Sequence, residues 1–173
     1  VIVGGGSGGC VMAGRLSEDP AVTVCLLEAG GSDQSAIVQA PVGAVAMMPT
    51  KLNNYAYETV PQPGLNGRRG YQPRGRVLGG SSSINAMLYV RGNRWDYDHW
   101  ASLGNPGWSY DDCLPYFKKA EHNEQIDNEW HGQGGPLNVT YPNHQSPLAD
   151  LFIEAAEQHQ IRRNDDYNGE MQD

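Results

Sequence analysis

Apolar residues along the first part of the chain alternate between runs typical of strands and spacing typical of a helix. Val1–Val3 is a β-branched apolar run, Gly4–Gly9 is rich in glycine, and Cys10–Ser17 carries apolar residues at helical spacing. Pro20 would end that helix because proline lacks a backbone N–H, and Val22–Leu27 is again a continuous apolar run. The order strand, glycine turn, helix and strand predicts a βαβ unit of about thirty residues, the building block of a doubly wound α/β sheet.

The pattern changes after this unit. Ser32–Pro73 is interrupted by five prolines and several glycines, which predicts loops and short helical turns. The apolar run Ile84–Tyr89 is predicted to be buried. Later elements predicted from spacing are an amphipathic helix over Tyr110–Glu121, a strand over Gly135–Thr140 and a helix over Leu148–Gln158.

Length and composition narrow the class of protein. The chain has 173 residues, which favours one domain, or one domain with part of a second. Twelve Lys and Arg against twenty Asp and Glu give a net charge of −8, which argues against a general nucleic-acid binder because phosphate affinity needs clustered positive charge. Glycine fills 22 positions, well above its usual share, and eight of the 22 precede residue 32. This excess indicates a site rather than a linker. No run approaches the roughly 18 apolar residues of a membrane-spanning helix.

Cysteine usage predicts neither a disulfide framework nor a metal site. Cys10, Cys25 and Cys113 are odd in number and lack a CxxC spacing, so no metal ligands are expected. Cys10 and Cys25 lie in apolar runs and are predicted to be small core residues. We therefore expect a reducing compartment and a cytoplasmic protein, with association to a membrane left open. Because Val1 leads directly into a short strand, we expect the N-terminal part of a longer protein, in which no targeting signal can be read.

The glycine turn has the spacing of a dinucleotide-binding motif. Gly4, Gly6 and Gly9 follow the pattern GxGxxG, in which glycine permits a tight turn, close approach to a pyrophosphate and close helix packing. The helix that follows offers free N–H groups to phosphates. Glu28 ends the second strand 22 residues after Gly6, where a carboxylate can accept hydrogen bonds from ribose hydroxyls. The same carboxylate would repel a 2′-phosphate, which disfavours NADP. A glycine turn that only packs is the alternative interpretation.

Positive charge is concentrated in the middle of the chain. Residues 59–95 contain no Asp or Glu but hold six arginines: Arg68, Arg69, Arg74, Arg76, Arg91 and Arg94. They surround a second glycine-rich run, Gly75–Ser83, and suit an anionic cofactor whose phosphates bind arginine and backbone N–H groups. For most of them, a solvated side chain or an ion pair elsewhere is the simpler interpretation. Arg76, beside the run, is the arginine that we expect at the cofactor.

The second run and several other segments together resemble one protein family. Gly75-Arg76-Val77-Leu78-Gly79-Gly80-Ser81-Ser82-Ser83-Ile84-Asn85, followed by Tyr89 and Gly92, is similar to the first signature of the glucose-methanol-choline (GMC) flavin oxidoreductases. The opening Val1–Cys10 resembles the FAD-binding start of that family. Resemblance continues at Leu26–Gly30, Asn66–Arg68, Tyr89–Gly92, Trp108–Tyr110, His131–Gly132, Gly135–Leu137 and Asp166–Gly169. It covers essentially the whole chain and is greatest to the bacterial branch that contains choline dehydrogenase and FAD-dependent alcohol dehydrogenases.

The resemblance implies a set of cofactor-binding residues. The residues that would line the FAD pyrophosphate are Gly4, Gly6, Ser7, Gly8 and Gly9. Glu28, with Ala29 next to it, would bind the adenosine ribose. The second loop over the cofactor would comprise Arg76, Gly79, Gly80 and Ser83. The residues that would lie against the isoalloxazine ring of the flavin are Asn85, Ala86 and Met87. Some members carry a histidine at the position of Ile84 and bond it to the flavin. Isoleucine cannot form that bond, so the FAD is expected to be non-covalent.

No catalytic residue is expected within this chain. The resemblance implies that a histidine near the C-terminus of a longer protein, paired with a second His or Asn, deprotonates the alcohol. Histidine suits this role because its pKa lies near the working pH. Surface or structural roles, in loops or on polar helix faces, are expected for His99, His122, His131, His144 and His159. Ser81–Ser83 has no base at a recognisable spacing, which argues against a serine hydrolase.

These observations predict an α/β fold: the N-terminal portion of a Rossmann-like FAD-binding domain over residues 1–95, and the beginning of an α+β substrate domain over residues 96–173. The implied activity is transfer of a hydride from the CH–OH group of a small-molecule alcohol, choline-like or aliphatic and primary, to flavin N5. An alcohol oxidase using oxygen is the alternative within the fold, and the electron acceptor is left open. A nicotinamide-binding domain would show further βαβ repeats after Glu28, and a non-enzymatic nucleotide-binding module would lack flavin absorbance. The chain alone is expected to be inactive.

Overall fold

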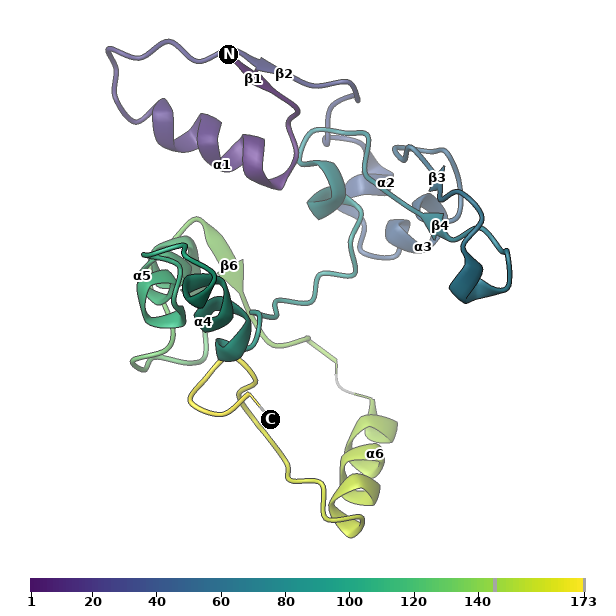
Figure 1. Ribbon diagram of the computed structural model, residues 1–173, viewed down its shortest axis with the longest axis vertical. Helices are drawn as coiled ribbons and strands as arrows, with labels where there is room; N and C mark the ends of the chain where they lie inside the picture. Colours follow the sequence, from purple (N-terminus) through teal and green to yellow (C-terminus); the bar gives the residue numbers. More distant parts are fainter. Residues whose placement is uncertain (145, 173) are drawn as a thin grey trace. The chain divides into compact units, whose positions relative to one another are not determined.

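The computed structural model describes residues 1–144 and 146–172 (Figure 1). The chain divides into two compact units, Val1–Leu88 and Tyr89–Asp173, each with its own internal packing. The fold is α/β, as expected, with short strands joined by helices and long connections. The sequence predicts a boundary after residue 95 between a cofactor domain and a substrate domain. That boundary stays a prediction.

The first unit opens with a parallel βαβ crossover. Strand β1 (Ile2–Val3) leads through the glycine turn into helix α1 (Ser7–Leu16), and strand β2 (Leu26–Leu27) returns beside β1 in parallel. A backbone hydrogen bond from Gly4 N to Leu27 O (2.7 Å) extends the pairing into the turn. This crossover, at the purple end of the chain in Figure 1, confirms the predicted Rossmann-like start.

Three local expectations about this crossover are wrong. Helix α1 begins at Ser7 rather than at Cys10, so residues that were assigned to the turn form its first helical turn. The second strand is two residues long instead of spanning Val22–Leu27, because β1 offers only two residues for pairing. Cys25 is exposed and Cys10 is half-buried, since the short strands leave both outside a fully closed core.

The rest of the first unit consists of short elements and loops, as the proline-rich pattern predicted. In chain order they are α2 (Ala36–Gln39), α3 (Gly43–Met47), β3 (Tyr57–Glu58), the 3-10 turn η1 (Pro63–Leu65), β4 (Tyr71–Gln72) and the 3-10 turn η2 (Gly80–Ser83). Strands β3 and β4 pair in antiparallel orientation. A small core joins Met47, Val77 and Ile84, with Ile37 and Val38 packed against it. This core fixes α2 and α3 against the segment that leads into η2.

The apolar run Ile84–Tyr89 is not buried as a whole, contrary to the prediction. Ile84 enters the core at 4% exposure, whereas Met87 and Leu88 are 61% and 82% exposed. The chain turns after Ile84: Met87 takes φ +59°, and its N–H donates to Asn85 Oδ1 (2.8 Å). This turn carries the following side chains away from the core.

Where the structure describes it, the second unit combines three helices with one parallel strand pair. Its elements are α4 (Arg94–Ser102), α5 (Tyr110–Ala120), β5 (Glu121–Asn123), β6 (Leu137–Val139) and α6 (Pro147–Gln158). The elements predicted near α5, β6 and α6 are confirmed, with their ends shifted by a few residues. Helix α4 was missed. It starts at a capping box in which Asn93 Oδ1 accepts from Trp95 N (2.9 Å) and Asp96 accepts from Asn93 N (3.0 Å).

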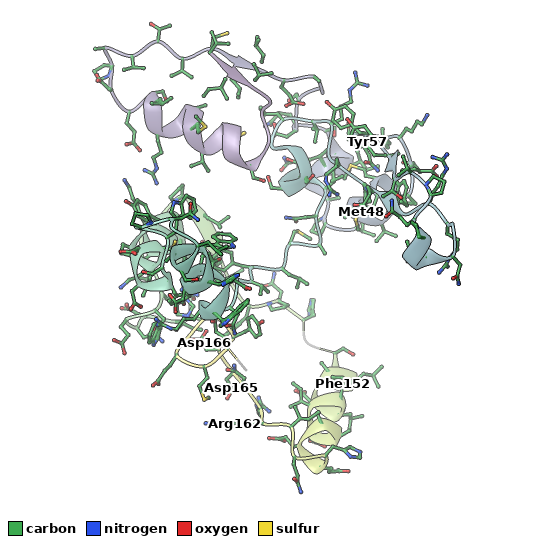
Figure 2. All side chains as sticks on the ribbon, viewed as in Figure 1. Met48, Tyr57, Phe152, Arg162, Asp165 and Asp166 are labelled. Carbon is green, nitrogen blue, oxygen red and sulfur yellow. The ribbon has the colours of Figure 1, made fainter. Side chains whose placement is uncertain are left out.

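Aromatic rings pack between the helices of the second unit. Tyr97 of α4 meets Tyr110 and Phe117 of α5 edge to face, with ring centroids 5.9 Å and 5.5 Å apart. Tyr116 is 72% exposed, whereas its neighbour Phe117 takes the inward position. On α6, Phe152 is also exposed (Figure 2). Among the described residues, no helix combines the length and the apolar character needed to cross a membrane.

Candidate nucleotide-binding site

The glycine turn between β1 and α1 has a shape that side chains would obstruct. Gly4 takes φ +99°, a left-handed conformation that glycine adopts without strain. A Cβ atom on Gly9 would lie 1.9 Å from the carbonyl oxygen of Gly4. Only glycine therefore lets α1 start this close to the turn, and the close packing expected of Gly9 follows from this contact.

The N-terminus of α1 is open to a ligand. Gly6 is the N-cap residue, and no side chain caps the helix. Cβ atoms on Gly6 and Gly8 would meet nothing within 4 Å, and Ser7 and Gly8 are exposed. The first N–H groups of a helix have no partner inside it, and the positive end of the helix dipole adds to their attraction for an anion. This end of α1 can therefore bind a phosphate group.

Glu28 joins the glycine turn to the segment after β2. Its carboxylate accepts from Gly5 N through Oε2 (2.7 Å) and from Gly30 N through Oε1 (2.7 Å). Each carboxylate oxygen has a second lone pair, so a ribose hydroxyl can still bind. Sequence reasoning missed Gly5 and Gly30, although the glycine pair Gly30-Gly31, two residues after Glu28, was a signal. A Cβ atom on Gly30 would lie 2.2 Å from the carbonyl group of Arg76, so this glycine lets the two segments touch.

The second glycine-rich loop contacts the first through backbone atoms. Gly79 N donates to Gly5 O (2.7 Å), and a Cβ atom on Gly80 would lie 2.7 Å from the Cα atom of Gly6. Gly79 and Gly80 take φ +91° and +59°, which favour glycine. The structure thus brings together two loops whose contacting residues lie more than seventy positions apart in the sequence, and both loops belong to the predicted site.

Arg76 and Ala29, both predicted site residues, also meet. Arg76 Nε donates to Ala29 O (3.3 Å), and its guanidinium lies over the ring of Tyr55, 5.7 Å from the centroid. The rest of the Arg76 side chain is exposed and free to reach an anion. Ser83 closes the second loop, since its hydroxyl donates to Leu78 O (2.7 Å).

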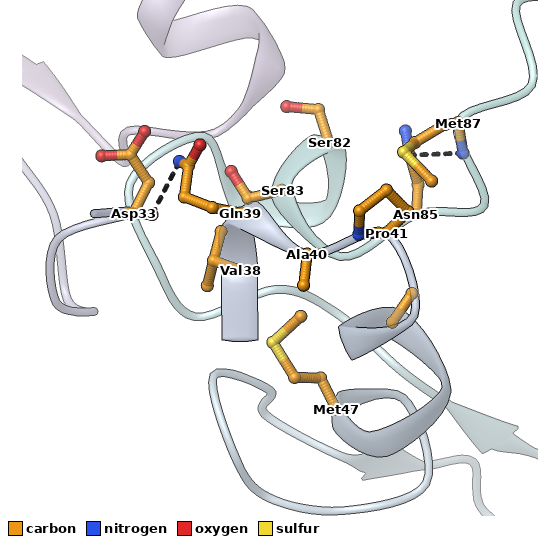
Figure 3. Close-up of a pocket in the computed structure, with 11 residues that line it drawn as sticks. Asp33, Val38, Gln39, Ala40, Pro41, Met47, Ser82, Ser83, Asn85 and Met87 are labelled. Carbon is orange, nitrogen blue, oxygen red and sulfur yellow. Dashed lines mark hydrogen bonds between the residues drawn. The ribbon is translucent and has the colours of Figure 1, made fainter. Parts of the chain in front are cut away.

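A pocket of about 170 Å³ opens beside the second loop (Figure 3). The second loop and the turn after it contribute Ser82, Ser83, Asn85 and Met87, and the facing wall comprises Asp33, Val38, Gln39, Ala40, Pro41, Ala44 and Met47. Ligand pockets usually exceed about 300 Å³, so this space can take one part of a dinucleotide cofactor. Asn85 and Met87 thus line a pocket, whereas Ala86 is exposed and does not line it.

The second unit contains a buried charge cluster that sequence reasoning did not find, formed by Arg91, Glu121 and His131, with the partly exposed Asp166 at its edge. Arg91 and Glu121 form an ion pair, and both are buried. His131 Nδ1 lies 2.7 Å from Glu121 Oε1, and His131 Nε2 lies 3.0 Å from the carboxylate of Asp166, which Figure 2 labels. Both ring nitrogens of His131 thus face carboxylates of the protein itself, which gives this histidine a structural role.

Electrostatic contacts keep the Arg91–Glu121 ion pair of this cluster charged. Burial alone raises the pKa of Glu121, but hydrogen bonds from His131 and Asn123, together with the charge of Arg91, outweigh it and lower the pKa below its ordinary value. Burial acts to lower the pKa of Arg91, but the hydroxyl of Tyr89 and the charge of Glu121 raise it above its ordinary value. Both partners are therefore ionised at neutral pH. Within residues 1–144 and 146–172, no group of acids, histidines and cysteines is arranged to hold a metal ion.

The open glycine turn, with an acid at the end of the next parallel strand, is the arrangement of Rossmann-like dinucleotide-binding domains, and the first unit is of this class. Comparison with known families narrows the class further. Residues 1–173 match the family model described as GMC oxidoreductase, and the chain belongs to this family. The resemblance noted in the sequence is confirmed.

Relatives are similar along the whole chain. The chain is 47% identical over 173 residues to a protein named oxygen-dependent choline dehydrogenase from Rhizobium etli, and 49% identical over 177 residues to one of the same name from Yersinia pseudotuberculosis. Among solved structures, pyridoxine 4-oxidase from Mesorbium loti is 40% identical, with a TM-score of 0.84 over 91% of the chain. The chain covers 32%, 31% and 31% of these three proteins, respectively. It therefore spans about a third of the length of its relatives.

Proposed function

We propose that this chain is the cofactor-binding part of an FAD-dependent oxidoreductase. The observation that carries the proposal is the contact between the two glycine loops, in which Gly80 approaches Gly6 so closely that a Cβ atom would lie 2.7 Å away. The residues around this contact fit FAD: the first N–H groups of α1 suit the pyrophosphate, Glu28 suits a ribose, and exposed Arg76 suits a phosphate. When bound, FAD supplies the hydride acceptor, and the residues of this chain bind and orient it.

The segment after β2 favours a flavin over a nicotinamide cofactor. A nicotinamide-binding domain would continue with further βαβ units. The described residues between β2 and the end of the first unit instead form the short helices α2 and α3, two 3-10 turns and the antiparallel pair β3–β4. The visible spectrum of the intact protein tests this choice directly. Two flavin absorption bands are expected, and a colourless protein that binds nicotinamide nucleotides would contradict it.

The proposed substrate is a small alcohol, choline-like or aliphatic and primary, oxidised at its CH–OH group. The names of the curated relatives, oxygen-dependent choline dehydrogenase, support a choline-like alcohol. The test is reduction of an artificial electron acceptor by the intact protein with choline and with a medium-chain primary alcohol in parallel. We expect reduction with at least one of them. Reduction with neither would contradict the proposed substrate class while leaving the flavin assignment open to its own test.

Two candidates remain for the electron acceptor: an acceptor other than oxygen, as in a dehydrogenase, and oxygen itself, as in an oxidase. The names of two relatives, oxygen-dependent choline dehydrogenase and pyridoxine 4-oxidase, favour oxygen. An oxygen electrode separates the candidates: an oxidase consumes oxygen in proportion to the alcohol added, whereas a dehydrogenase needs the artificial acceptor. Both activities use the same cofactor site.

We infer that FAD is held without a covalent bond. Ile84 has no nucleophilic atom, and its side chain packs in the core with Met47 and Val77. Acid precipitation of the intact protein is expected to leave yellow FAD in the supernatant. A yellow pellet would contradict non-covalent binding.

A reducing compartment, the cytoplasm, is proposed for the protein. Cys10, Cys25 and Cys113 are free thiols in the structure. Cell fractionation with activity measurement tests this, and activity confined to the membrane fraction would contradict a purely cytoplasmic protein.

A further inference from the structure

Asn54 sits at the centre of a hydrogen-bond network next to the second glycine loop. Its side chain is buried, at 3% exposure. Its Oδ1 accepts from Ala56 N (3.0 Å) and from Arg74 N (2.8 Å). Its amide nitrogen, which has two hydrogens to donate, is surrounded by four oxygens within hydrogen-bond distance: Met47 O (3.4 Å), Met48 O (3.0 Å), Thr50 O (2.9 Å) and Tyr71 Oη (2.9 Å). Both polar atoms of this buried amide are therefore fully engaged.

The backbone around Asn54 needs this support. Asn53 and Ala56 take φ +52° and +50°, a left-handed conformation that is unfavourable for alanine. The hydrogen bond from Ala56 N to Asn54 Oδ1 stabilises the tight turn between them. Tyr71 adds a second connection, because its hydroxyl donates to Met48 O (2.6 Å) while it accepts from Asn54. The segment from α3 to β3 is thereby fastened to β4.

The network reaches the cofactor loops through backbone contacts. Asn54 forms an antiparallel bridge with Gly75, flanked by a hydrogen bond from Arg76 N to Asn53 O (2.7 Å). Gly75 N donates to Ser81 Oγ (3.1 Å), and a Cβ atom on Gly75 would lie 2.1 Å from Gly80 O. Gly80 is the residue that touches Gly6 of the first loop. A short, close-packed path thus leads from the Asn54 amide to the contact between the two loops.

We propose that Asn54 is a positioning residue for the cofactor: its amide fixes residues 74–76 and so sets how the second glycine loop lies against the first. The inference rests on the proposed binding of FAD by these loops. Asn54 does not touch the loops' ligand-facing side; it acts through Arg74 and Gly75. A donor and an acceptor are both required, because Oδ1 faces two N–H groups and the amide nitrogen faces only oxygens.

The variant Asn54→Asp tests this requirement in the intact protein. Aspartate keeps the acceptor for Ala56 N and Arg74 N but turns a second oxygen toward carbonyl oxygens. A buried carboxyl in such surroundings favours its protonated form, which can donate again. We expect the Kd for FAD, measured by quenching of flavin fluorescence, to be about tenfold higher than in the native protein at about pH 8 and to return toward the native value at about pH 5.5.

Two control variants separate the donor from other effects. Asn53→Asp adds the same charge one residue away and gives up only a weak hydrogen bond from the Asn53 amide to Met47 Sδ (3.4 Å). Repulsion of an anionic cofactor would therefore appear in this variant as well. Asn54→Leu removes both donor and acceptor and is expected to bind FAD weakly at both pH values. The result that supports the inference is that acid restores FAD affinity in Asn54→Asp and in no other variant.

Each other outcome overturns the inference. Native affinity in Asn54→Asp and Asn54→Leu shows that the amide does not position the loop. Weak binding without rescue by acid, or equal loss in Asn53→Asp, assigns the effect to stability or to charge. Failure of both Asn54 variants to fold at either pH, or faster hydrogen exchange over all of residues 1–88, makes Asn54 a general folding residue. Absence of FAD binding by the native protein contradicts the proposed function itself, which distinguishes that failure from the others.

Discussion

Replacing Glu121 by glutamine removes one charge from the buried charge cluster with almost no change of shape. The carboxylate accepts from His131 (2.7 Å) and Asn123 (2.9 Å) through Oε1 and pairs with Arg91 through Oε2, and it is fully buried. Glutamine keeps one acceptor but turns an NH₂ group toward a guanidinium that can only donate. Breaking a buried ion pair from one side leaves the other charge uncompensated, which costs about 3–5 kcal/mol.

Hydrogen exchange of the intact protein measures this loss locally. Because about 1.4 kcal/mol corresponds to a factor of ten, amides of β5 and α5 that exchange through opening of the second unit should exchange roughly 100- to 4,000-fold faster in Glu121→Gln. Glu124→Gln is the matched control. Its exposed carboxylate bonds to Asn138 (2.8 Å) and Thr140 (2.8 Å) on the surface, and little change is expected.

Acid should erase the difference in hydrogen exchange between the native protein and Glu121→Gln. The folded-state pKa of Glu121 lies below its ordinary value, so its contribution to stability is present above about pH 4.5 and is lost as the pH falls through the folded value. The difference in exchange between native protein and Glu121→Gln is therefore full at neutral pH and shrinks in acid. Equal exchange at neutral pH, or a difference that persists in acid, would refute the argument that the buried charge stabilises the unit.

Three further predictions concern the cofactor loops of the intact protein. Gly80→Ala should lower the affinity for FAD, because the new methyl group would lie 2.7 Å from the Cα atom of Gly6; Gly14→Ala on α1, where a Cβ atom meets nothing within 4 Å, is the control that should bind normally. Glu28→Ala should weaken FAD binding by about 1.5–3 kcal/mol in a fluorescence titration, and an unchanged affinity would leave Glu28 a purely structural role. Asn85→Leu should slow flavin reduction in stopped-flow measurements more than it weakens FAD binding, because a polar group near the flavin stabilises the charge that develops there. If the variant's flavin is reduced at the native rate, Asn85 has only a packing role.

The βαβ crossover was predictable because its signals are local. Two apolar runs, a glycine turn and Pro20 stand at the spacing that the crossover requires, and the parallel pairing follows. The first turn of α1 was hidden because Gly8 and Gly9 are poor helix formers. The helix nevertheless starts at Ser7, where Cys10 N donates to Gly6 O (2.9 Å). The close packing of Gly9 against Gly4 stabilises this first turn despite the low helix propensity of glycine.

The charge cluster and Asn54 could not be predicted from sequence patterns. Charged residues are usually exposed, and Arg91, Glu121 and Asp166 lie tens of positions apart, so no spacing relates them. Asn54 stands in a proline-rich stretch where asparagine is an ordinary loop residue. Its burial depends on contacts with Tyr71 and Arg74 that only the folded chain creates. Glycine spacing thus indicated the site at which we propose that a cofactor binds, whereas the residues that hold this site in shape became visible only in three dimensions.

The bonds that close the second unit have a consequence for the order of events during synthesis. Arg91 N donates to Asn168 Oδ1 across 77 positions, and Gln172 Nε2 donates to Gly92 O across 80. A ribosome adding about 5–20 residues per second needs several seconds to make that length of chain. Until then the backbone N–H of Arg91 lacks its Asn168 partner, whereas Glu121 and Trp130, which bond to its guanidinium, are made much earlier. The two ends of the unit are therefore joined last, and a nascent chain stalled before Asn168 can form the ion pair but not the bonds that close the unit.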